Sequence, residues 1–189
     1  MLSEPDRSTL LTFAREAITA IAHNQPLPKI SLESLSPPMH EERATFVTLT
    51  EHGELRGCIG GLYATMPLAL DVQHHAVAAA TEDPRFPPVA AGEVQHLRIE
   101  ISILTLPELV PHKSPEDLLA ILRPNVDGVI LKSGRHRSTF LPQVWEKVTD
   151  AITFLEMLSE KAGASPNLWR EATTDVYRYQ VEVFEEDRD

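Results

Sequence analysis

The one cysteine of the chain, Cys58, lies in the segment 55–60, which reads Leu-Arg-Gly-Cys-Ile-Gly. Side chains two positions apart share a face of an extended strand, so Arg56, Cys58 and Gly60 are expected on one face and Gly57 on the other. A guanidinium beside a thiol lowers the thiol pKa, which is about 8.5 for a free cysteine, and so increases the fraction of thiolate. The segment therefore predicts an activated cysteine nucleophile. The alternative is a small, buried apolar residue.

A cysteine nucleophile is commonly assisted by a base that is near in space, and the chain has 8 histidines. We take His136 as the candidate base because it lies on a predicted hairpin immediately before the segment 139–145; the alternative is an exposed turn histidine. His74 and His75 are adjacent in a predicted helix, so they point about 100° apart and do not form the i, i+4 pair of a helical metal site. We expect no metal and no cofactor.

Two glycines and an arginine are candidates for ligand binding near the thiol. Gly57 and Gly60 have no side chain to keep a ligand or a second backbone away from the sulfur. Arg85 lies in the proline-rich loop 83–89, and its guanidinium suits a carboxylate or a phosphate. The alternative for this loop is a stiff connector, pinned by Phe86, that clamps a helix onto the sheet.

Two further charged residues complete the set of candidates. Glu100 points away from the apolar face of its predicted strand, and a carboxylate there could pair with Arg56. Arg135 belongs to the basic segment 132–137, which is expected to bind an acidic ligand or partner; the alternative is a solvated turn. A protein, a peptide or a small anionic ligand is therefore the expected partner of Arg56, Arg85 and this segment.

The composition narrows the class of protein. A formal net charge of −11 argues against nucleic acid as the main partner, because such binding depends on Lys and Arg that neutralise phosphates. No apolar run approaches the roughly 20 residues of a membrane span, so no membrane partner is expected. The N-terminal residues lack a basic segment followed by an apolar stretch, so we expect a cytoplasmic protein. A single cysteine also cannot form an internal disulfide.

Periodicity along the chain predicts an α+β fold with antiparallel sheets and flanking helices. The runs 44–50 and 55–61 flank His52 and Gly53, which predicts a β-hairpin with Cys58 on its second strand. The last strand, 176–184, is expected to return to the same sheet as this hairpin. The other expected elements are a helix through residue 21, a helix over 65–80, a strand over 99–104, a helix over 115–122, a hairpin over 128–141 and a helix over 150–163.

The segment 55–60 also matches the signature hexapeptide of the AMME chromosomal region family, whose domain is called the AMMECR domain and which is protein A of the AmmeMemoRadiSam system. Five more segments resemble that family's blocks, in its order and at its spacing. They are residues 67–69, 83–89, 100–104, 128–131 and 139–145. The chain resembles the family from about residue 8 to about residue 185.

The resemblance implies one domain of two unequal α+β subdomains. The larger is expected to hold about residues 1–105 and 172–189, and the smaller about 106–171, with the signature strand and Arg85 facing a cleft between them. The resemblance also implies a functional association with a Memo-like protein and a radical S-adenosylmethionine enzyme. The predicted function is a cleft, centred on Cys58, that binds a substrate or partner and carries thiol-dependent chemistry. The alternative is a non-catalytic adaptor or peptide-binding module in which Cys58 is structural.

Overall fold

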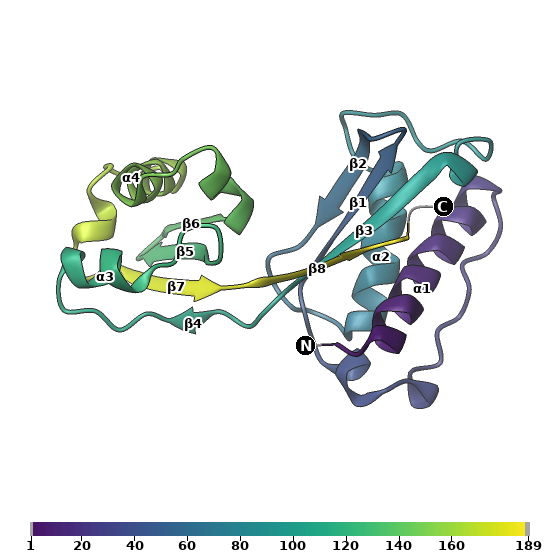
Figure 1. The fold of residues 1–189 in the computed structure, drawn as a ribbon, viewed down its shortest axis with the longest axis horizontal. Helices are drawn as coiled ribbons and strands as arrows, with labels where there is room; N and C mark the ends of the chain where they lie inside the picture. The colour runs from purple at the N-terminus through teal and green to yellow at the C-terminus, as the bar shows by residue number, and fades with distance from the viewer. Residues whose placement is uncertain (1, 188–189) are drawn as a thin grey trace. The chain divides into compact units, whose positions relative to one another are not determined.

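The protein, seen in a computed structural model that describes residues 2–187, divides into two compact units. The first unit is Met1–Leu104 with Glu182–Asp189, and the second is Thr105–Val181. Each unit contains one four-stranded sheet with helices (Figure 1). The strands pair antiparallel, so the predicted α+β fold is confirmed. None of the helices formed by residues 2–187 is long and apolar enough to cross a membrane.

The sheet of the first unit has the strand order β2-β1-β3-β8, so β2 is an edge strand. Helices α1 and α2 pack side by side; α2 contacts β1 and β2, and α1 contacts β3 (Figure 1). The bounds of these elements are α1 Glu4–Ala22, β1 Thr45–Glu51, β2 Glu54–Gly60, α2 Leu68–Thr81, β3 Leu97–Leu104 and β8 Val181–Glu185, with short 3-10 turns η1 Leu32–Ser34, η2 Pro37–His40 and η3 Val94–His96.

Local sequence explains where α1 begins and which face it buries. The Ser3 side chain accepts a hydrogen bond from the backbone of Asp6, whose carboxylate in turn accepts from the backbone of Ser3. A cap of this kind stabilises a helix by about 1 kcal/mol. Leu10, Ala14 and Ile18 recur at a spacing of four residues, and all three are fully buried. The apolar stripe that the sequence predicts is therefore the face that packs against the sheet and α2.

Alternation of buried and part-exposed residues in β1 and in the first half of β3 gives this sheet two different faces. Val47 and Leu49 of β1, with Ile99 and Ile101 of β3, are fully buried in the core that the helices cover. Thr48 lies between the two buried β1 residues, so its side chain points to the opposite face. The register pairs Thr48 with Cys58 on one side and with Glu100 on the other.

The sheet of the second unit has the strand order β4-β7-β5-β6. Its core contains Trp145, whose ring stacks on Phe154 with centroids 3.7 Å apart. The elements of this unit are β4 Glu108–Leu109, α3 Pro115–Ile121, β5 Gly128–Ser133, β6 His136–Phe140, η4 Pro142–Glu146, α4 Ala151–Lys161, η5 Leu168–Arg170 and β7 Asp175–Tyr179.

The prediction of one last strand over 176–184 is wrong in its pairing. Residues 175–179 form β7, which pairs with β4 and β5 in the second unit, and only residues 181–185, as β8, join the first sheet. The break falls at Gln180, whose backbone N–H donates to Thr105 Oγ1 and whose carbonyl accepts from the Thr105 N–H, both at 2.8 Å. Side-chain alternation continues through this point, and so the sequence pattern alone does not reveal the change of sheet.

Candidate functional site

Cys58 is half-buried near the end of edge strand β2, on the face of the sheet opposite the helices. Its cross-strand neighbour is Thr48, whose hydroxyl donates a hydrogen bond to the Cys58 sulfur at 3.2 Å. Thr48 is the only hydrogen-bond partner of Sγ among residues 2–187.

Asp83, in the loop after α2, fixes the backbone of Cys58 from the open edge of the sheet. Its Oδ2 accepts a hydrogen bond from the Cys58 N–H at 2.9 Å, in the position where a further strand would otherwise pair. The carboxylate is almost fully buried, with 3% of the side chain exposed. Oδ1 and Oδ2 of Asp83 also accept hydrogen bonds from the Arg85 side chain. These bonds hold the pKa of Asp83 well below its usual range, with the Arg85 side chain as the largest cause.

Arg85 is joined to the backbone of Cys58 through the Asp83 carboxylate. Its Nε lies 2.9 Å from Asp83 Oδ1, and its Nη2 lies 2.6 Å from Asp83 Oδ2. Hydrogen bonding to Asp83 raises the pKa of Arg85, and attraction to the charge of Cys58 raises it further. About half of the Arg85 side chain, 54%, is exposed, and no residue within 2–187 accepts a hydrogen bond from its Nη1. The guanidinium is therefore oriented by Asp83 and still open to a ligand.

Arg56, which the sequence places beside the thiol, has a different partner. A β-bulge leaves it without a partner in β1, since Leu49 pairs with Gly57 and Thr50 with Leu55. The bulge interrupts the strict alternation that puts Arg56 and Cys58 on one face. The Arg56 side chain is buried, and its Nε and Nη2 donate to the two carboxylate oxygens of Glu93 at 2.8 and 3.2 Å.

The sequence predicts Glu100 as the partner of Arg56, and the structure shows Glu93 in its place. The hydrogen bond from Arg56 is the largest cause that lowers the pKa of Glu93. Glu100 lies opposite Thr48 on the face that carries Cys58. Burial, and then the nearby charge of Glu185, raise the pKa of Glu100 above its usual range. The expectation that Glu100 pairs with Arg56 is wrong because Glu93 binds the guanidinium.

One aromatic ring lies between the two arginines. The Phe86 ring centroid is 5.9 Å from Arg56 Cζ and 5.5 Å from Arg85 Cζ. Both distances fall within the range of cation–π attraction. Loop 83–89 therefore contacts the edge of β2 through Asp83 and Phe86, as expected of a stiff connector. The ligand-binding role of Arg85 stays a prediction.

The glycines of the signature segment allow close packing. A Cβ on Gly57 would lie 2.2 Å from the backbone oxygen of Ala79, so helix α2 approaches β2 closely there. A Cβ on Gly60 would lie 2.3 Å from the ring of Phe46. The space beside these two glycines is thus filled by the protein itself. Their role in binding a ligand stays a prediction.

The remaining sequence candidates, Arg135 and His136, belong to the second unit. Arg135 is exposed in the turn between β5 and β6. His136 begins β6, and its Nδ1 lies 3.0 Å from the carbonyl oxygen of Ala162. No histidine of the described part of the chain is hydrogen-bonded to the Cys58 sulfur. The role of His136 as a base stays a prediction.

Sequence reasoning missed a buried polar cluster on the opposite, helix-covered side of the sheet. Asp71 Oδ2 accepts a hydrogen bond from Thr45 Oγ1 at 2.6 Å and lies 3.0 Å from His75 Nδ1. Asp71 and His75 are four residues apart on α2, and this spacing is the signal that identifies the pair. Residues 2–187 contain no group of three or more His, Cys, Asp or Glu that could hold a metal ion.

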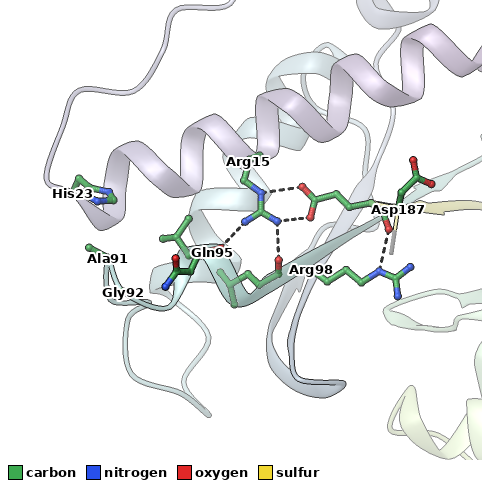
Figure 2. Close-up of a pocket in the computed structure, with 10 residues that line it drawn as sticks. Arg15, His23, Ala91, Gly92, Gln95, Arg98 and Asp187 are labelled. Atoms are coloured by element: carbon green, nitrogen blue, oxygen red, sulfur yellow. Dashed lines mark hydrogen bonds and ion pairs between the residues drawn. The ribbon is translucent and has the colours of Figure 1, made fainter. Parts of the chain in front are cut away.

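A cavity of about 1040 Å³ in the first unit is separate from this constellation (Figure 2). Arg15, at its wall, donates to the carbonyl oxygens of Val94 and Leu97 at 2.7 and 2.8 Å and binds both carboxylate oxygens of Glu186. Arg98 donates through Nε to the Glu186 carbonyl at 3.0 Å. These guanidinium donors already bond to the protein, so the cavity is weaker evidence for a ligand site than the exposed Arg85.

Three comparisons with known proteins agree with one another. The family described as AMMECR1 matches residues 11–184. A protein of Methanothermobacter thermautotrophicus is 40% identical over 190 residues, 98% of this chain and 97% of the relative. Protein MJ0810 of Methanocaldococcus jannaschii is 38% identical, over 93% of this chain and 89% of its own. A crystal structure described as uncharacterized protein PH0010 from Pyrococcus horikoshii superposes with a TM-score of 0.78 at 34% identity, over 94% of this chain and 90% of that one.

Proposed function

The chain belongs to the AMMECR1 family, and on that premise we propose that Cys58 and Arg85 form a binding site for a small anionic ligand or an acidic segment of a partner protein, with thiol-dependent chemistry at the sulfur. The family membership that the hexapeptide and the later blocks predict is thereby confirmed. The observation that carries the proposal is the bridge through Asp83. One buried carboxylate binds both the Cys58 backbone and the Arg85 guanidinium.

The bridge supports anion binding because it orients the Arg85 guanidinium and leaves some of its N–H donors without an acceptor. A guanidinium has five N–H donors, and Asp83 takes those of Nε and one on Nη2. Nη1, which has no acceptor among residues 2–187, can donate to a carboxylate or phosphate without breaking the bridge. An arginine that is already oriented loses less conformational entropy on binding than a free one. Arg56 is a weaker candidate for the same role because Glu93 engages it and its side chain is buried.

The proposed chemistry at Cys58 starts from the thiolate form of the sulfur. Thr48 donates to Sγ, and Arg85 adds a positive charge nearby. A thiolate attacks an electrophile without first giving a proton to a base. This is consistent with the absence of a histidine partner to Sγ within residues 2–187.

A specific observation also favours the second candidate, an adaptor in which the thiol is never consumed. The Cys58 backbone is bonded to Asp83, and its side chain accepts from Thr48, so Cys58 also helps to close the free edge of β2. In that case binding survives Cys58→Ala and fails with Arg85→Gln. A catalytic cysteine instead predicts that turnover is lost with Cys58→Ala while binding remains.

The proposed partners are the Memo-like protein and the radical S-adenosylmethionine enzyme. The cytoplasmic location and the cleft around Cys58 stay predictions. The test is calorimetric titration of each purified partner into wild type, Cys58→Ala, Arg85→Gln and the control Arg98→Gln. Arg98 lies on β3 and bonds to Glu186 and Glu185. Binding that is weakened by Arg85→Gln and kept by Arg98→Gln supports the proposal. If no partner binds wild type, the proposed association is wrong.

A further inference from the structure

Strand β2 is an edge strand, and its outer edge is covered along only part of its length. Arg56 and Gly57 are buried, whereas residues 58–60 are part-exposed. At the covered end the Cys58 N–H donates to Asp83 Oδ2 at 2.9 Å, so the loop after α2 takes the place of a further strand at this one position. Native proteins usually protect a free edge, because its unpaired backbone groups can bind another chain.

The backbone groups at the part-exposed end of β2 also point outward. In an antiparallel pair, the N–H and C=O of successive residues point alternately toward the partner strand and away from it. Gly61 points toward β1, since its N–H donates to the Thr45 carbonyl at 2.9 Å. Gly60 and Cys58 therefore point away from β1. Within residues 2–187 nothing pairs with the Gly60 N–H or the Cys58 carbonyl, so a donor and an acceptor are open to an extended chain.

A positive charge lies next to this open stretch of the edge. Arg85 Nη2 and the Cys58 N–H share one acceptor, Asp83 Oδ2, at 2.6 and 2.9 Å, so Nη2 lies within two hydrogen-bond lengths of the Cys58 nitrogen. The Nη1 of Arg85 has no acceptor in the part of the chain that the structure describes. An added strand with an acidic side chain therefore complements both the backbone edge and the guanidinium.

We propose that an extended, acidic peptide segment of a partner protein adds as a further strand along the edge of β2 at residues 58–60. Its backbone donates to the Cys58 carbonyl and accepts from the Gly60 N–H, and one of its carboxylates binds Arg85 Nη1. In strand addition the main-chain bonds give affinity and the side-chain contacts give specificity. The inference rests on the proposed function at Cys58 and Arg85, and it selects the acidic segment over the small anion.

The test uses pools of acetylated, amidated pentapeptides with valine, threonine or isoleucine at four positions and a fixed central residue. One pool has glutamate at the centre, the second has glutamine, and the third has glutamate and a methyl group on every residue's backbone nitrogen. In ¹H–¹⁵N spectra of the whole chain, the glutamate pool should shift the Gly60 amide saturably and slow its hydrogen exchange. Exchange of the Gly61 amide, which already donates to Thr45, should not change. The methylated pool should not bind, because it has no donor for the Cys58 carbonyl.

Arg85→Gln should weaken binding of the glutamate pool by about two- to fivefold, as expected for one part-exposed charge, and should leave binding of the glutamine pool unchanged. The control Arg98→Gln should bind both pools like wild type, because Arg98 is already bonded to Glu185 and Glu186.

Two results overturn strand addition itself. Neither pool slows exchange of the Gly60 amide, or the amide becomes protected without peptide as the protein concentration rises, which makes a second copy of the chain the occupant. If the methylated pool binds as tightly as the unmodified one and still depends on Arg85, strand addition is wrong and the proposed anion site stands. If Arg85→Gln binds the glutamate pool like wild type, the acidic preference and the proposed role of Arg85 are both wrong.

Discussion

Replacing Arg85 with glutamine should slow the reaction of Cys58 with iodoacetamide at neutral pH. The substitution removes the positive charge that Asp83 joins to the Cys58 backbone. It also leaves the Asp83 carboxylate, bonded to the Cys58 backbone, without its ion-pair partner. We therefore expect both changes to slow attack by the sulfur, which reacts as the thiolate.

The exposure of Arg85 sets the size of this effect. With 54% of its side chain exposed, the guanidinium is largely screened by water, so we expect a fall of about two- to fivefold in rate. Screening also predicts a salt dependence. The Debye length falls from about 10 Å at 0.1 M to about 3 Å at 1 M, so the ratio of wild-type to variant rates should shrink toward one at high salt.

The assay is the pseudo-first-order alkylation rate, followed by intact mass, for wild type, Arg85→Gln, Arg98→Gln and the double variant Asp83→Asn/Arg85→Gln. Arg98→Gln should react like wild type. The double variant should recover part of the lost rate, because it removes the uncompensated carboxylate as well. The reasoning is refuted if Arg85→Gln reacts as fast as wild type, or if Arg98→Gln slows the reaction equally.

Three other predictions concern the packing at Gly57, the ionisation of Asp83 and the binding of nucleic acid. Gly57→Val should lower the melting temperature far more than Cys58→Ala, because any Cβ at position 57 meets the Ala79 carbonyl oxygen at 2.2 Å; equal melting temperatures would contradict this. Asp83→Asn should be less stable than wild type at pH 7. Since the folded state lowers the pKa of Asp83, that difference should hold above about pH 4 and shrink as the pH falls below it, as measured by urea unfolding. Finally, single-stranded and duplex oligonucleotides at about 0.15 M salt should bind no tighter than roughly 10⁻⁴ to 10⁻⁶ M, and submicromolar, salt-sensitive binding would refute that.

Local signals in the sequence predict the elements that carry the site. The turn at His52 and Gly53 predicts the β1–β2 hairpin, and both residues have positive φ, 52° and 86°. Apolar periodicity predicts α1, and the proline-rich composition of loop 83–89 predicts that its polar residues have fixed positions. Each of these signals depends on a few neighbouring residues, and this is why sequence alone reveals them.

The partners of Cys58 depend on distant residues, so the sequence could not assign them. The bulge at Arg56 exists only in the register between β1 and β2, and no local pattern distinguishes it from regular alternation. Asp83 is 25 residues from Cys58, and the bond between them needs α2 to place the loop at the free edge of β2. Glu93 captures Arg56 from 37 residues away for the same reason. Sequence reasoning named the thiol and both arginines, but it did not find that Glu93 binds Arg56 or that Asp83 joins Arg85 to the Cys58 backbone.

Protection of Cys58 by an anion tests most directly whether the thiol and Arg85 form one binding site. The measurement is the iodoacetamide alkylation rate with increasing phosphate, at an ionic strength held constant with chloride, for wild type and Arg85→Gln. Iodoacetamide is uncharged, so constant ionic strength separates occupation of the site from screening. Phosphate should slow the alkylation of wild type saturably and leave Arg85→Gln unaffected. Equal rates with and without phosphate in wild type, or equal protection of both proteins, would contradict a shared site.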